Sequence, residues 1–151
     1  LKLRMDIIPT SLAIAQAAKE SGWGTSRFAL EGNAMFGQWT WGKDGIEPKE
    51  KKTNQDHKIL KFPMLRSSVK AYMINLNTHR GYKEFREARA ELRRRNRNMS
   101  GLELVNYLYN YAQTGSEYVK VLKKIIKQNE LTDFDNSVLM NRGKSSSSLT
   151  L

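Results

Sequence analysis

Apolar residues recur every three to four positions along most of this chain, which is the spacing of amphipathic helices. The first such run, at 12–20, is dominated by alanine and follows a helix-start signal at Pro9, Thr10 and Ser11. Its small side chains predict a largely buried helix that ends at Gly22. The same spacing predicts further helices at 26–32, 67–80, 82–97, 100–112 and 116–129.

Serines mark several of the predicted helix starts. Ser26 is expected to cap the short second helix, and Ser67 or Ser68 the third. Ser100 and Glu103 stand at the spacing of a capping box, in which each side chain satisfies a backbone N–H group of the other residue.

Between residues 37 and 62 the pattern changes from helical spacing to alternation. Residues 38–41 and 58–62 alternate polar and apolar side chains, and a polar, glycine-containing segment separates them. This predicts a small antiparallel β lobe with a long loop, inserted among helices. Residues 132–151 are rich in Asn, Gly and Ser and are expected to form a flexible C-terminal tail. With no internal repeat or linker, the chain is expected to fold as one mainly α (α+β) domain.

Composition narrows the possible functions without choosing one. The 151 residues contain no cysteine, which excludes thiol catalysis, Cys-ligated zinc and disulfides. A formal net charge of +11 favours polyanionic partners, namely nucleic acid, anionic lipid or bacterial cell wall. No apolar run is long enough to span a membrane. His57 and His79 are far apart and have no carboxylate at ligand spacing, so no metal or cofactor is expected.

Glu20 is the strongest candidate for chemistry. It ends the alanine-rich helix, where the partial negative charge of the helix C-terminus disfavours a second negative charge. Trp23 follows closely, and an apolar ring beside a carboxyl group also disfavours the ionised form. Both effects raise the pKa of Glu20 and favour a protonated general acid, as in lysozyme, whose catalytic acid lies against a tryptophan. The alternative is a surface glutamate at a frayed helix end.

Two segments early in the chain, residues 11–24 (SLAIAQAAKESGWG) and 33–37 (NAMFG), carry recognisable motifs. They resemble the first two motifs of the bacterial glucosaminidase family, which includes autolysins and the wall-cutting domains of flagellar rod-cap proteins. Residues 61–72 and 110–119 resemble two later motifs, and 75–82 (NLNTHRGY) resembles the Bax-like subgroup in particular. The resemblance covers residues 8–131.

The resemblance implies a lysozyme-like catalytic domain over residues 1–131, with a helical body and the β lobe at about 37–62. It implies that Glu20 is the general acid. It also implies a catalytic role for Tyr111, which lines the opposite side of the cleft and orients the 2-acetamido group or a water. A second carboxylate is often assigned to the β lobe in such proteins. Of Asp44, Glu47, Glu50 and Asp56 we choose Glu47, with a solvated loop as the alternative. The residues that the family resemblance places in the sugar-binding groove are Trp23, Asn33, Phe36 and Gln38.

Trp39 and Trp41 are two further candidates for sugar binding. Alternate positions of a strand point to one side, so both indole rings are able to stack on sugar rings. Packing in the core explains the two residues equally well.

The function implied by the resemblance is that of an endo-β-N-acetylglucosaminidase that cleaves β-1,4 bonds of peptidoglycan glycan strands. The location implied is the bacterial cell envelope, periplasmic or exported, with any signal or anchor outside this chain. The alternatives are a wall amidase and a non-catalytic module that binds glycan. We expect a monomer.

A basic run at 86–97 raises nucleic acid as a rival partner. Acidic residues interrupt this run, and Glu91 stands four residues before Arg95, which favours a solvated, salt-bridged helix face. No nucleic-acid partner is therefore expected.

Overall fold

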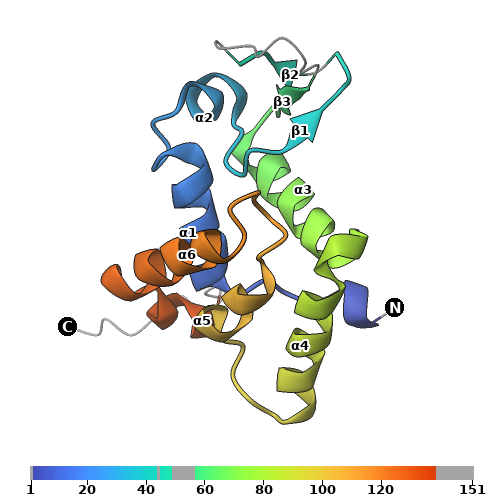
Figure 1. The fold of residues 1–151 in the computed structure, drawn as a ribbon, viewed down its shortest axis with the longest axis vertical. Coiled ribbons are helices and arrows are strands. Elements are labelled where there is room, and N and C mark those ends of the chain that lie inside the picture. Colours follow the sequence, from blue (N-terminus) through green and yellow to red (C-terminus); the bar gives the residue numbers. More distant parts are fainter. Residues whose placement is uncertain (1, 44, 49–56, 139–151) are drawn as a thin grey trace, which may run out of the picture.

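The computed structural model describes residues 2–43, 45–48 and 57–138, and it is mainly helical with one small sheet (Figure 1). This confirms the predicted fold class. The α-helices are α1 (Thr10–Ser21), α2 (Arg27–Gly32), α3 (Leu65–Thr78), α4 (Lys83–Arg94), α5 (Gly101–Leu104) and α6 (Ser116–Gln128). The 3-10 helices are η1 (Lys2–Arg4), η2 (Arg80–Tyr82), η3 (Val105–Tyr107) and η4 (Leu131–Asn136). The strands are β1 (Trp39–Thr40), β2 (Gly45–Ile46) and β3 (Lys58–Leu60).

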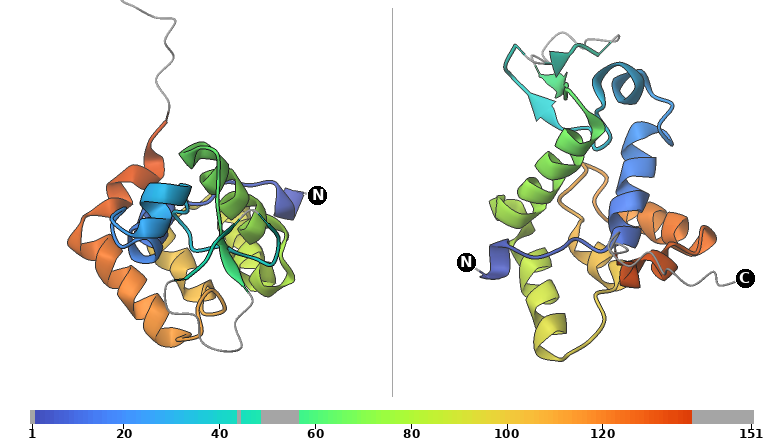
Figure 2. Two further views of the ribbon diagram at one scale, coloured as in Figure 1. Left: turned by 90° about the horizontal axis from the view of Figure 1, so that it is seen from above. Right: turned by 180° about the vertical axis from the view of Figure 1, so that it is seen from behind.

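The sheet and α2 lie at one end of the molecule, and α4, α5 and α6 lie at the other. Helices α1 and α3 run between the two ends, as Figure 1 and the view from behind in Figure 2 show. The sheet is antiparallel in the order β1-β3-β2, with Trp39 opposite Ile59. The β lobe expected at 37–62 is therefore present in the described part of that range.

Helix α1 is buried along one side, as its alanine-rich sequence predicts. Leu12 and Ala15 are fully buried in the core, and Ala18 is nearly so. The helix ends at Gly22, whose φ of 58° is left-handed and whose N–H group bonds the carbonyl of Ala18. Glycine adopts this conformation without the steric cost that a Cβ atom brings. Glu20 consequently occupies the last turn of a well-anchored helix.

The expected start of α3 at Ser67 or Ser68 is wrong. The helix begins at Leu65, and its N-cap Met64 provides no side-chain hydrogen bond. Ser68 is instead buried, and its Oγ accepts a hydrogen bond from the Met35 N–H group at 3.2 Å. The predicted cap at Ser100 is confirmed, because its Oγ accepts from the Glu103 N–H group at 3.3 Å.

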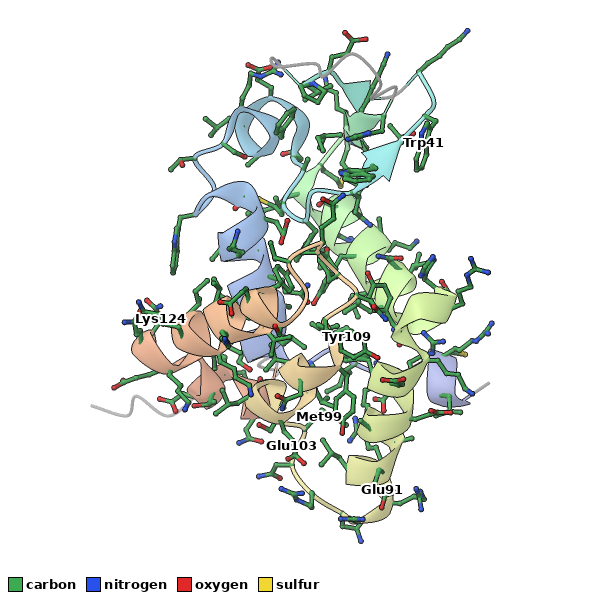
Figure 3. All side chains as sticks on the ribbon, in the orientation of Figure 1. Trp41, Glu91, Met99, Glu103, Tyr109 and Lys124 are labelled. Atoms are coloured by element: carbon green, nitrogen blue, oxygen red, sulfur yellow. The ribbon has the colours of Figure 1, made fainter. Side chains whose placement is uncertain are left out.

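The arginine-rich run at 86–97 lies on α4 and the turn after it, and only part of it forms the predicted exposed face. Arg95 bonds Glu91 at 2.6 Å and Arg97 bonds Glu103 at 3.0 Å, near the labelled acids in Figure 3. Arg86 and Arg89 are buried and donate to backbone carbonyl groups. Many of the run's guanidinium groups are therefore engaged within the protein.

The expectation of a flexible tail is wrong for residues 132–136, which belong to η4 and pack against α1. Asp135 explains this order. Its Oδ1 accepts from the Ser11 N–H group at 2.8 Å, and its Oδ2 accepts from the Gly101 N–H group at 3.0 Å. Both donors lie in the first turn of a helix, so a single carboxylate caps α1 and α5. Residues 139–151, the rest of the expected tail, lie outside the described residues.

We expect Asp135→Ala to lower the free energy of unfolding by about 2 kcal/mol, because two helix N-termini lose their cap. Chemical denaturation monitored by far-UV circular dichroism measures this loss. Asp133→Ala is the matched control, since Asp133 is exposed on the same 3-10 helix. Equal stability of the two variants would contradict the capping role.

Within the described residues, no helix combines the length and the apolar character needed to cross a bilayer.

Candidate active site

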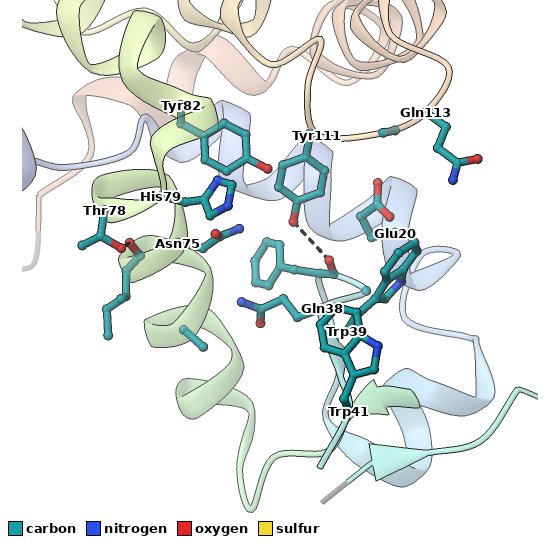
Figure 4. A pocket seen from close by; sticks show the side chains of 15 residues that line it. Glu20, Gln38, Trp39, Trp41, Asn75, Thr78, His79, Tyr82, Tyr111 and Gln113 are labelled. Atoms are coloured by element: carbon teal, nitrogen blue, oxygen red, sulfur yellow. Dashed lines mark hydrogen bonds between the residues drawn. The ribbon is translucent and has the colours of Figure 1, made fainter. Parts of the chain in front are cut away.

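A pocket of about 900 Å³ lies between the end of α1, the segment entering the β lobe, and α3 (Figure 4). Its volume is in the range of sites that bind small molecules or parts of polymers. One wall comes from α1 and the chain that follows α2: Glu20, Phe36, Gly37, Gln38, Trp39 and Trp41. The other wall comes from α3 and η2: Ala71, Ile74, Asn75, Thr78, His79 and Tyr82. The loop before α6 adds Tyr111, Ala112 and Gln113.

Glu20 is half-buried in this pocket. Burial raises the pKa of its carboxyl group, while a hydrogen bond from Tyr118 and the charge of Lys19 act in the opposite direction. The direction of the shift agrees with the sequence-based expectation, but the expected cause is partly wrong. Trp23 is 62% exposed and does not line the pocket. Its φ of 57° makes it part of the left-handed turn that ends α1.

Gly37 allows the chain to pass close to Glu20. A Cβ atom at this position would lie 3.3 Å from Oε2 of Glu20, and the φ of 59° is left-handed. The preceding residue, Phe36, is buried and stacks on Tyr72 with a centroid distance of 4.0 Å. The glycine of the NAMFG motif therefore brings one wall of the pocket against the acid.

Asn33 lies outside the pocket and supports one of its walls. It ends α2 with a φ of 52°, and its side-chain amide donates to the carbonyl of Phe62 at 3.0 Å. Because Phe62 follows β3, this bond ties α2 to the β lobe. The structure thus gives Asn33 a supporting position instead of the predicted place in the groove.

Tyr111 lines the pocket from the loop before α6. Its hydroxyl group donates to the carbonyl of Phe36 at 3.1 Å, and its ring stacks on Tyr118 at 5.6 Å. The hydroxyl therefore joins this loop to the wall that carries Glu20, as the dashed line in Figure 4 shows. Burial raises the pKa of Tyr111, so the residue stays a neutral hydrogen-bonding group.

Trp39 and Trp41 both line the pocket, on the side that carries Glu20 (Figure 4). Trp39 stacks on His57 with a centroid distance of 4.1 Å, which fixes its ring plane. Trp41 is 75% exposed and so is not held in the core. Gln38 lies beside them in the same wall.

The α3 wall of the pocket was not predicted as part of the site. Ala71, Asn75 and Thr78 follow helical spacing, so they face the same side of α3. His79 accepts a hydrogen bond from the Gly81 N–H group at Nδ1, at 3.2 Å. The sequence signal for this wall was the motif at residues 75–82, because it places several polar residues at the end of a helix.

The structure places Glu47 outside the pocket. It lies just after β2, where its carboxylate is 3.5 Å from Nζ of Lys58. Asp44, Glu50 and Asp56 lie outside the described residues. Among the described residues that line the pocket, Glu20 is the only one with a carboxylate. Across the described part of the chain, no three His, Asp or Glu side chains gather as metal ligands.

Comparison with known proteins gives matches over most of the chain. A family model named Glucosaminidase, described as mannosyl-glycoprotein endo-beta-N-acetylglucosaminidase, matches residues 1–131. Protein bax of Escherichia coli (strain K12) is 36% identical over 130 residues, which cover 84% of this chain and 45% of that protein. The chain thus spans less than half the length of this relative. No solved structure matches the chain.

Proposed function

The chain belongs to the glucosaminidase family, within which it is Bax-like, and from this premise we propose that it hydrolyses β-1,4 glycosidic bonds of peptidoglycan. The bond that we assign is the one on the reducing side of N-acetylglucosamine. The catalytic domain is residues 1–131, and its place of action is the bacterial cell envelope.

One observation carries the proposal: the carboxyl group of Glu20 is half-buried, with a raised pKa, in a pocket that two tryptophans also line. A glycosidase needs a carboxylic acid that is still protonated when the substrate binds. Burial supplies that condition here. The indole rings supply flat apolar surfaces for the C–H faces of sugar rings.

In the proposed reaction, Glu20 donates its proton to the glycosidic oxygen as the bond between that oxygen and C1 breaks. Positive charge develops at C1 in an oxocarbenium-like transition state. Water, or first the oxygen of the 2-acetamido group, then attacks C1. The Glu20 carboxylate finally accepts the proton released by water. Tyr111 ties the loop before α6 to the wall that carries Glu20 through its bond to Phe36.

Mass spectrometry of the soluble fragments released from purified peptidoglycan tests the proposal. Fragments that end in reducing N-acetylglucosamine would support it. Reducing N-acetylmuramic acid would keep the reaction class and overturn the bond assignment. Release of stem peptides alone would indicate an amidase. Co-sedimentation with the wall and no released fragment would indicate a binding module.

We expect Trp41→Ala to raise the KM for soluble glycan fragments about tenfold with little change in kcat, because a stacking surface is lost while Glu20 is untouched. Initial rates across a range of fragment concentrations separate the two constants. Trp23→Ala is the matched control, since that indole is exposed outside the pocket. An unchanged KM in Trp41→Ala would remove this residue from the substrate-binding surface.

A further inference from the structure

Four lysines form a stripe along the outer side of α6. They are three or four residues apart, so they share one side of the helix: Lys120, Lys123, Lys124 and Lys127. Leu122 and Ile126 lie on the other side and are fully buried in the core. Three of the four lysines are exposed, and Lys123 is half-buried. Figure 3 shows Lys124 at the outer edge of the molecule. The lysine stripe therefore faces solvent.

Most of the charge on this stripe is not balanced by acids of the described part of the chain. Lys120 pairs with Glu117 at 2.5 Å. The other three lysines form no ion pair with a described residue. On α4 the exposed cations are arranged differently, because Arg94 and Arg95 both pair with Glu91. The arginines of α4 are thus engaged within the protein, whereas the lysines of α6 are left to a partner outside it.

The spacing of the stripe is unfavourable for the helix itself. Like charges three or four residues apart on a helix repel and weaken it. Lys120 lies next to Lys123 and Lys124, and Lys127 lies next to the same two residues. The partial negative charge of the helix C-terminus offsets this repulsion only in the last turn, at Lys127. Uncharged polar residues would keep this side of α6 hydrated without the repulsion, so the four charges need a reason beyond solubility.

The position of α6 links the stripe to the candidate active site. Residues 111–113 line the pocket, and α6 begins three residues later at Ser116. From there the helix runs outward for 13 residues, about 20 Å, to the edge of the molecule (Figures 1 and 2). A polymer that leaves the pocket on this side would therefore pass along the lysine stripe.

We propose that the lysine stripe is a second wall-binding surface, which holds carboxylate groups on the stem peptides of the peptidoglycan strand that enters the pocket. This inference rests on the proposed function, since it names substrate groups that bind beyond the cleft. Stem-peptide carboxylates recur along the glycan at variable positions. Lysine suits them because its ammonium group is a point charge on a flexible stem, whereas the guanidinium group of arginine requires a fixed geometry. The attraction keeps the protein on the wall between cleavages.

Two other polyanions fit α6 less well. A helix that lies on an anionic bilayer inserts large apolar side chains beside its cations. On α6, Val121 is the large apolar residue that is exposed, at 37%. Proteins that bind single-stranded nucleic acid stack bases on exposed aromatic rings, and proteins that read duplex DNA rely on arginine. The single aromatic residue of α6, Tyr118, is buried, and the helix contains no arginine. Charge without stacking or insertion therefore favours the carboxylates of the wall.

Co-sedimentation with purified peptidoglycan tests the proposal in a triple variant, Lys123→Gln, Lys124→Gln and Lys127→Gln. Both this variant and its parent carry Glu20→Gln, so that hydrolysis does not consume the wall. At about 0.05 M salt we expect the triple variant to bind about tenfold more weakly than the parent, as the loss of three exposed ion pairs predicts. Near about 1 M salt the two affinities should converge, because salt screens exposed charges.

The matched control removes the same three charges from α4, through Lys83→Gln, Arg94→Gln and Arg95→Gln. These side chains are exposed, outside the pocket and paired with acids. We expect the control to bind within about twofold of the parent. Equal weakening of both triple variants would show that net charge alone governs binding, and it would overturn the inference.

Amidation of the wall carboxylates with methylamine identifies the chemistry of the partner. The parent should bind the amidated wall about tenfold more weakly, and the α6 triple variant should lose nothing further. If the parent binds both walls alike, the stripe does not act through carboxylates. If the triple variant keeps its affinity for the wall but loses affinity for phosphatidylglycerol vesicles or single-stranded DNA, the partner is a membrane or a nucleic acid. Either outcome overturns the inference.

These binding measurements need no hydrolysis, so the proposed function and this inference fail separately. In the background that retains Glu20, we expect the α6 triple variant to keep the wild-type kcat and KM on glycan fragments without stem peptides, and to lose rate only on intact wall. Urea denaturation should show it to be at least as stable as wild type, because like-charge repulsion is relieved. A clear loss of stability would show that the lysines serve the fold, and it would overturn the inference.

Discussion

Glu20→Gln is expected to lower the rate of peptidoglycan hydrolysis by about three orders of magnitude, because glutamine keeps the shape of the side chain but has no acid proton. Binding should persist, since the indole rings and the α3 wall are unchanged. Release of reducing ends from purified wall measures the rate, and co-sedimentation measures the binding. A variant that still releases the wild-type fragments at the wild-type rate would remove Glu20 from the chemistry.

Glu47→Gln is the control for this experiment. Its carboxylate faces Lys58 at 3.5 Å outside the pocket, so we expect the wild-type rate. A large loss in this variant would assign the second carboxylate to Glu47 after all. Together the two variants separate an acid within the pocket from one on the β lobe.

Glu20→Gln is also expected to change the stability of the protein, and the direction of the change follows from the raised pKa of Glu20. Burial raises the pKa of Glu20 in the folded protein above its unfolded value. Wild-type stability is therefore fully present below the unfolded pKa and declines as pH rises through the folded pKa. Because glutamine does not ionise, the stability of the variant does not decline in this way as the pH rises. Glu20→Gln should melt at a higher temperature than wild type at neutral pH, and this advantage should vanish in acid.

The sequence predicted those parts of the fold that depend on local pattern. The alanine-rich run of α1 and its stop at Gly22 specify a buried helix with Glu20 in its last turn. Alternation around Trp39 and Ile59 specifies two strands, which pair in the structure. In each case the periodicity of side chains along the chain determines which face is buried, so the prediction needs no knowledge of distant partners.

The parts that sequence missed depend on contacts between distant segments. Asp135 caps α1 from a position 124 residues away, and no local pattern distinguishes it from its neighbours in a polar C-terminal stretch. Trp23 was expected beside the acid because it is near in sequence, but the left-handed turn directs the chain away. His79 and Asn75 join the site because α3 crosses opposite α1, which is a property of packing.

Arg89 is the second residue at which a single change should have a large effect, in this case on stability. Its side chain is fully buried although its sequence neighbours suggested an exposed basic face. It donates to the carbonyl groups of Leu3 and Ile7 at 3.0 and 2.9 Å, and to Oδ1 of Asn77 at 2.6 Å. The guanidinium group thus satisfies backbone acceptors of the N-terminal segment that the helices leave unpaired.

We expect Arg89→Met to lower the free energy of unfolding by about 3 kcal/mol or more, since several buried acceptors lose their donor at once. Urea denaturation measures the loss, and proteolysis of the N-terminal segment reports its release. Arg95→Met is the matched control, because that side chain is exposed at the C-terminal end of α4 and its guanidinium group pairs with Glu91. Its denaturation midpoint should stay at the wild-type value. If both variants unfolded at the wild-type midpoint, the N-terminal segment would not belong to the cooperative core, and the arginine-rich run would be available to an anionic partner after all.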